Sequence, residues 1–157
     1  ALPISKMFQR AEKIVINNRK YYTYFLWSSG SAITRYADNY FSSITAFYRN
    51  AMDYCNMFED NIAQKRKFSS LYLKLAMTNM KQISCYRDMS VIRKHELIRH
   101  ICENKDIQMA IRMADHNPRK ELVKRMIRKR KYREICTFYQ LISFVQKTIR
   151  SVENACL

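Results

Sequence analysis

Glycine and proline are nearly absent from this sequence, which has one glycine and two prolines. Because the tight turns of β-hairpins are usually built from Gly, Pro, Asn and Asp, a chain so poor in the first two has few sites for closely connected strands. With 157 residues, 48% of them hydrophobic, the chain is still long and apolar enough to bury a core. The composition therefore predicts an all-α fold and a single helical domain over residues 1–157.

Long apolar runs and catalytic motifs are also missing. No run reaches the roughly 18 apolar residues of a membrane-spanning helix, and there is no P-loop, dinucleotide fingerprint or serine nucleophile elbow. His95, His100 and His116 have no zinc-like spacing to Cys102 or to one another. We therefore expect no enzymatic activity, no catalytic residue, no cofactor, no metal and no small-molecule substrate.

Acidic residues are scarce, with 13 Asp and Glu against 29 Lys and Arg and a net charge of +16. Such an excess costs self-repulsion and usually accompanies a polyanionic partner. Nucleic acid, an anionic membrane and an acidic glycoprotein coat all qualify, and charge alone does not choose among them. The chain begins ALPIS without an initiator Met, which is typical of a mature secreted protein and equally of a trimmed chain. We expect secretion.

The five cysteines leave two interpretations open. They are Cys55, Cys85, Cys102, Cys136 and Cys156. In a secreted protein they could form two disulfides and leave one thiol, in fifteen pairings (five choices of the odd one out, times three connectivities). Cys55, Cys102 and Cys136 fall among apolar residues at helical spacing, so they can equally be buried thiols that pack as small hydrophobes.

Apolar residues at spacings of three and four predict a long helix from Ser31 to about Ala63. At about 1.5 Å per residue it would be roughly 50 Å long, which implies an elongated bundle. A polar KRK turn is predicted at 65–67, and Ser90 is predicted as an N-cap. Other helices are predicted at about 6–27, 68–83, 90–102 and 106–115, and from an Asn117–Pro118 start to about 152. Together these segments predict an elongated five-helix bundle, or a bundle of six helices if every predicted segment is counted.

The last predicted helix carries an apolar stripe in its second half, again at spacings of three and four. This pattern is typical of a face turned toward the core. Its members are Ile135, Phe138, Ile142, Val145, Ile149 and Val152.

The stretch KRMIRKRKYR, residues 124–133, concentrates the charge. From Arg119 to Arg133 nine basic residues stand against one acid, Glu121, a net of 9 − 1 = +8. In a helix, Arg128–Lys131 would cover most of the circumference at about 100° per residue, so these residues cannot be buried. We expect this basic tract to project from the bundle, or to lie at its end, and to dock onto a polyanion. Its members are Arg119, Lys120, Lys124, Arg125, Arg128, Lys129, Arg130, Lys131 and Arg133.

Two aromatic segments, YYTYFLW at 21–27 and ICTFYQLISFV at 135–145, are apolar on more than one helix face. Core packing accounts for most of this, but some of these groups should be exposed or meet a partner. Tyr and Trp suit membrane interfaces because each ring has an apolar body and a polar tip. The candidate contacts with a membrane or partner are Tyr21, Tyr22, Tyr24, Phe25, Leu26, Trp27, Phe138, Tyr139 and Phe144. Charge would dock the chain first, and apolar surface would then insert.

Trp27, Gly30 shortly after it, and the segment ITRYADNYFSSITAFYRNAMDY together resemble the abalone sperm acrosomal proteins, the family of egg lysin and its fusagenic paralogue. The resemblance implies a five-helix fold, storage in the acrosomal vesicle, release at the egg surface and no enzymatic activity. Within that family, lysin opens the egg envelope stoichiometrically by binding an egg-coat glycoprotein, and the paralogue is associated with fusing lipid bilayers. The five cysteines and the charge at 119–133 depart from the lysin pattern and favour the paralogue.

The leading hypothesis is a non-enzymatic, secreted sperm protein that binds anionic membranes and promotes sperm–egg membrane fusion. One alternative is binding to, and opening of, an acidic egg-coat glycoprotein. Another is a basic helical cytokine or a nucleic-acid-binding module. No helix-turn-helix signature stands out, so no specific nucleic acid is expected, although any protein this basic binds DNA non-specifically. Exposed apolar surface could equally form a homodimer interface.

Overall fold

The computed structural model describes residues 37–58 and 61–155, without the side chains of Arg119 and residues 150–155. The chain divides into two units, Ala1–Thr34 and Arg35–Leu157, and the described residues belong to the second. The single-domain prediction stays a prediction. Across the described ranges the regular structure is helical, without strands, which confirms the all-α bundle. The helices are α2 (Tyr40–Cys55), α3 (Ile62–Cys85), α4 (Val91–Glu103), α5 (Lys105–Met113), α6 (Pro118–Arg128) and α7 (Tyr132–Ala155).

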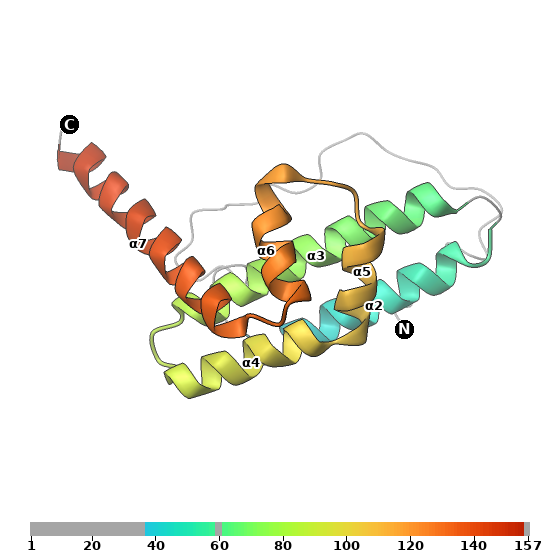
Figure 1. The fold of residues 1–157 in the computed structure, drawn as a ribbon, viewed down its shortest axis with the longest axis horizontal. Helices are drawn as coiled ribbons and strands as arrows, with labels where there is room; N and C mark the ends of the chain where they lie inside the picture. The colour runs from blue at the N-terminus through green and yellow to red at the C-terminus, as the bar shows by residue number, and fades with distance from the viewer. Residues whose placement is uncertain (1–36, 59–60, 156–157) are drawn as a thin grey trace, which may run out of the picture. The chain divides into compact units, whose positions relative to one another are not determined.

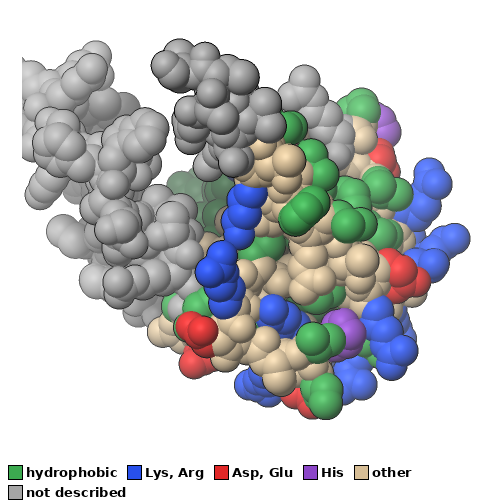
Figure 2. Space-filling model, turned by 90° about the vertical axis from the view of Figure 1, so that its left-hand side faces the viewer, with side chains coloured by type: hydrophobic (Ala, Val, Ile, Leu, Met, Phe, Trp, Pro, Cys, Tyr) green, Lys and Arg blue, Asp and Glu red, His purple; other side chains and the backbone are tan. Residues whose placement is uncertain are grey.

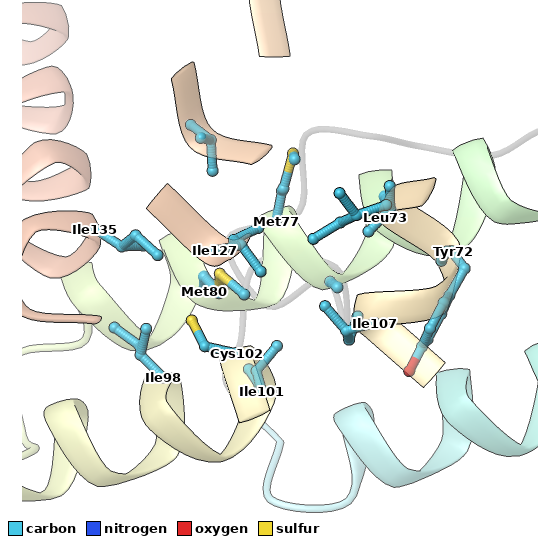
Figure 3. Close-up of a cluster of buried hydrophobic side chains, with 14 of the residues drawn as sticks. Tyr72, Leu73, Met77, Met80, Ile98, Ile101, Cys102, Ile107, Ile127 and Ile135 are labelled. Carbon is cyan, nitrogen blue, oxygen red and sulfur yellow. The ribbon is translucent and has the colours of Figure 1, made fainter. Parts of the chain in front are cut away.

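Helix α3 is the centre of this bundle and packs against α2, α4, α5 and α7 (Figure 1). Its buried residues include Tyr72, Leu73, Met77 and Met80, which meet isoleucines from the other helices (Figure 3). Burial of large side chains of this kind contributes about 1.5–3 kcal/mol each. The core therefore lies around the C-terminal two thirds of α3.

Four buried polar side chains beside this core, two on α2 and two on α3, are paired with one another. The Tyr48 and Tyr72 rings stack with their centroids 4.3 Å apart. The Tyr72 hydroxyl lies 2.9 Å from Thr45 Oγ1, and the Tyr48 hydroxyl lies 3.1 Å from Ser69 Oγ. Because each hydroxyl has a hydrogen-bond partner, α2 and α3 can bury these rings without leaving a polar atom unsatisfied.

The predicted long helix is wrong on both sides of α2, because residues 37–39 are not helical and α2 stops at Cys55, where a turn follows. Asn61 holds this turn: its Nδ2 donates to the carbonyl oxygens of Cys55, at 2.6 Å, and Phe58, at 2.7 Å. The Cys55 carbonyl is one that the end of α2 leaves without an intrahelical partner, and the Phe58 carbonyl lies in the turn that follows. As a result Phe58 and Ile62, whose spacing would continue the apolar face of the predicted helix, are exposed. The predicted KRK turn at 65–67 is also wrong, since those residues lie inside α3.

The predicted starts of two helices are confirmed. Ser90 is the N-cap of α4, and its side-chain oxygen accepts a hydrogen bond from the Arg93 N–H at 3.3 Å. Asn117 and Pro118 stand at the N-cap and first turn of α6 as expected, although the Asn117 side chain makes no capping bond. Asn104 ends α4 and begins α5, where its Oδ1 accepts from two backbone N–H groups.

Candidate functional site

The basic tract does not lie on one continuous helix, contrary to the prediction. α6 ends at Arg128, and α7 begins at Tyr132 after a tight turn. In this turn the Lys131 N–H donates to the Met126 carbonyl at 2.9 Å, and the Arg130 N–H donates to the Ile127 carbonyl at 3.0 Å. This is the Schellman pattern of a helix C-terminus, and it requires left-handed backbone at the residue after the cap. Arg130 fills that position, with φ of 55°.

The turn explains how four successive cations avoid burial. Arg128, Lys129, Arg130 and Lys131, which we name the basic turn, are all exposed. The sequence predicted their exposure from helical geometry, and the structure achieves it by ending α6 at Arg128 and placing the other three in the turn. Glycine is the usual residue at such a left-handed position because it has no Cβ to clash. An arginine there places its charge at the tip of the turn at a conformational cost of roughly 1–2 kcal/mol.

The rest of the basic tract is divided between surface and interior. Arg125 and Arg133 are exposed, and the Arg133 guanidinium lies 6.0 Å from the centroid of the Tyr132 ring. Lys120 is partly buried; burial, followed by the nearby Lys74 and Lys124 charges, lowers its pKa. The Arg119 side chain lies outside the described residues.

Lys124 does not belong to a docking surface, which corrects the prediction. Its side chain is buried, and its ammonium donates to the Asp115 carbonyl at 2.8 Å and pairs with Glu121 at 3.2 Å. A lysine with its donors used inside the fold ties α6 to the loop before it and is unavailable to a partner. Lys131 keeps its place on the surface, where it forms an exposed ion pair with Glu134 at 3.2 Å, and solvent screens pairs of this kind so that they add little to stability. The Glu134 pKa is lowered by a backbone hydrogen bond first and by Lys131 second.

The residues predicted to contact a membrane or partner through apolar side chains are also divided between surface and interior. Phe144 is exposed, at 69%. Tyr139 is 8% exposed and belongs to the core, so its assignment as a partner contact is wrong. Phe138 is partly buried against the core, and its ring centroid lies 5.6 Å from that of Tyr139. The candidates from Tyr21 to Trp27 lie outside the described residues.

Beyond Tyr139, α7 presents large apolar side chains to solvent. We name these the α7 apolar face: Leu141, Phe144, Val145 and Ile149. The apolar stripe predicted Val145 and Ile149 to be buried, but this part of α7 extends away from the other labelled helices (Figure 1). On the surface seen in Figure 2, hydrophobic side chains lie beside Lys and Arg, with few acidic side chains between them. The exposed half of the stripe could not be distinguished from the buried half by spacing alone.

Hollows lined by described residues also lie outside the basic tract. One, of about 340 Å³, is lined by α2, α3 and α4, including Phe41, Asn79 and His100. Another, of about 250 Å³, is lined by the α3–α4 connection, α4 and α7. No group of three His, Cys, Asp or Glu residues in the described ranges is placed to hold a metal ion. No described helix is long and apolar enough to cross a membrane.

Comparison with protein-family models, with curated proteins and with solved structures finds no match. The function must therefore be argued from the chain's own surface.

Cys55, Cys102 and Cys136 are buried free thiols, as one interpretation of the sequence predicted, and burial raises the Cys102 pKa to about 12. A thiol that stays protonated is a poor nucleophile, so Cys102 acts as a packing residue.

Proposed function

We propose that this chain is a non-enzymatic protein that binds anionic membrane surfaces and perturbs them. The observation that supports the proposal best is the α7 apolar face, which stays in solvent on a chain of net charge +16. Exposed apolar groups beside cations are typical of surfaces that lie in a membrane interface, because charge attracts anionic headgroups and apolar groups enter below them. The resemblance to sperm acrosomal proteins extends the proposal: a secreted acrosomal protein that promotes sperm–egg membrane fusion.

The exposed basic turn supplies the electrostatic part of this proposal. Each cation near an anionic membrane is worth about 1 kcal/mol, so three together change binding by roughly a hundredfold at low salt. Salt weakens such binding because the Debye length is about 10 Å at 0.1 M and 3 Å at 1 M. Membrane binding through this surface should therefore be strong for anionic vesicles, weak for neutral ones, and sensitive to salt.

The test is vesicle binding, leakage and lipid mixing with anionic and neutral vesicles. The triple variant Arg128→Gln, Lys129→Gln, Arg130→Gln should lose most of the binding. The matched control removes three cations from α3: Lys65→Gln, Arg66→Gln, Lys67→Gln. If both triples bind equally, the basic turn has no special role. If the native chain leaves anionic vesicles intact but dissolves isolated egg envelopes, the function is binding to an acidic egg-coat glycoprotein instead.

A further inference from the structure

A second cationic feature lies away from the basic turn, in the hollow of about 250 Å³ between the end of α3, α4 and α7. Helix α7 packs against both α3 and α4 here. We name it the α4–α7 pocket. Its lining residues are Ser84, Cys85, Arg87, Lys94, Gln140, Ser143, Phe144 and Lys147.

Three cations and no acid line the α4–α7 pocket. Arg87 comes from the α3–α4 connection, Lys94 from α4 that follows it, and Lys147 from α7, which is distant in sequence and brings the third cation to the other two. None of the three side chains forms a hydrogen bond or ion pair with a described residue. Like charges repel in a small volume, so folding alone gives no reason to gather them.

Lys94 is the decisive residue, because it is 8% exposed and still lines the pocket. Lys124, the other buried lysine of the described chain, has a carbonyl and a carboxylate as partners. Lys94 has neither. Burial raises the pKa of the Cys136 thiol, and the nearby Lys94 charge opposes that rise. The Lys94 stem is buried, while its ammonium stays accessible at the pocket and adds to the positive potential of Arg87 and Lys147. The pocket therefore has the composition of an anion-binding site.

The neutral polar groups of the pocket are mostly occupied by the fold itself. Ser84 Oγ donates to the Met80 carbonyl at 2.7 Å, and Gln140 Nε2 donates to the Ser84 carbonyl at 3.2 Å. The Cys85 thiol donates to the Tyr139 carbonyl at 3.7 Å. These bonds fix the walls and leave the three cations, with the Ser143 hydroxyl, to face a ligand.

We propose that the α4–α7 pocket binds the phosphomonoester headgroup of a membrane lipid. A phosphomonoester carries a charge of about −1.5 to −2 and three acceptor oxygens, which matches three converging cations better than the single charge of a phosphodiester. The lipid assignment comes from Phe144, which lines the pocket and also belongs to the α7 apolar face. A headgroup in the pocket places its acyl chains beside exposed apolar side chains. This inference rests on the membrane binding proposed above and names the lipid that is selected.

The test compares vesicles containing phosphatidic acid with vesicles containing phosphatidylserine, matched for surface potential. The native chain should bind the phosphatidic acid vesicles more tightly. The double variant Arg87→Gln, Lys147→Gln should lose that preference by about tenfold or more, because charge-assisted contacts are lost. The matched control is Arg99→Gln, an exposed cation of α4 outside the pocket, which should keep it. Lys94→Met, which keeps the buried stem, should act like the double variant if its thermal unfolding stays cooperative.

Failure of this inference can be separated from failure of the proposed function. If the native chain binds both vesicle types equally, and the pocket variants behave as Arg99→Gln does, membrane binding stands but the pocket assignment is wrong. If no anionic vesicle binds, the membrane proposal itself fails. If a soluble sulfated polysaccharide binds with the same dependence on Arg87 and Lys147 while vesicles do not, the occupant is a polysaccharide and the lipid assignment is overturned.

Discussion

The two halves of α7 share one helix and one apolar period, yet only the first is buried. Ile135, Cys136 and Tyr139 lie in the core, whereas Val145 and Ile149, which continue the same pattern, are about half exposed. Helix α7 packs against α3, α4 and α6, and toward its C-terminus it extends beyond them (Figure 1). Periodicity therefore shows which residues share a face, and neighbouring helices decide whether that face becomes core or binding surface.

The largest effect should come from truncating the buried half. Ile135 is 0% exposed, so Ile135→Ala should lower the free energy of unfolding by about 2–5 kcal/mol, because it removes transfer free energy and leaves a cavity. Ile149→Ala on the exposed half should change it by about 0.5 kcal/mol or less. Urea unfolding followed by circular dichroism measures both. Equal losses would mean that something covers Ile149 and that the α7 apolar face is not free.

Alkaline pH should lower the stability of the fold through its buried tyrosines. Burial raises the pKa of Tyr72 from 10.0 to about 12 and also raises that of Tyr139. Below pH 10 these groups are protonated in both states, but between pH 10 and about 12 only the unfolded chain ionises, so stability falls as pH rises. The expected loss is about 1.4 kcal/mol per pH unit for each such group. Tyr139→Phe should flatten the dependence measured by urea unfolding; an unchanged slope would exclude Tyr139 as a contributor.

The exposed half of α7 should contribute to membrane binding and contribute little to the stability of the fold. Phe144→Ser should weaken partitioning into anionic vesicles by about tenfold, because an aromatic side chain no longer enters the interface. The matched control is Leu122→Ser, an exposed apolar residue on α6. Flotation with vesicles measures the partitioning. If Leu122→Ser has the same effect, general surface hydrophobicity, not the α7 apolar face, drives binding. If Phe144→Ser changes the oligomeric state instead, the face is a homodimer interface.

The sequence was sufficient for the fold class and for individual helix starts. Scarcity of Gly and Pro predicted helices, and Ser90 was correctly recognised as a cap because its hydroxyl can accept from the first turn. Helix ends were harder. The α2 end depends on the Asn61 side chain reaching back to Cys55 and Phe58, a tertiary detail that an uninterrupted apolar stripe conceals.

The candidate site was predicted only in part, for a similar reason. The exposed cations of the basic turn could be found from charge density, but Lys124 could not be separated from them without knowing that Asp115 and Glu121 receive its ammonium. The α4–α7 pocket was missed entirely. Lys147 lies far along the sequence from Arg87 and Lys94, and no local pattern relates the three until α7 packs against α4.

The smallest predicted effect concerns the turn that joins α6 to α7. Arg130→Gly should stabilise the fold by about 1 kcal/mol, because glycine adopts a φ of 55° without the clash that a Cβ causes. Lys129→Gly removes the same charge at a φ of −85°, where glycine only adds unfolded-state entropy, and should destabilise. Urea unfolding and vesicle binding of the two variants separate conformation from charge. If Arg130→Gly stabilises the fold, Lys129→Gly destabilises it, and both lose the same small amount of vesicle binding, then the strained backbone position holds an arginine for its charge. If Arg130→Gly is neutral or destabilising, the turn is not strained and the arginine needs no functional explanation.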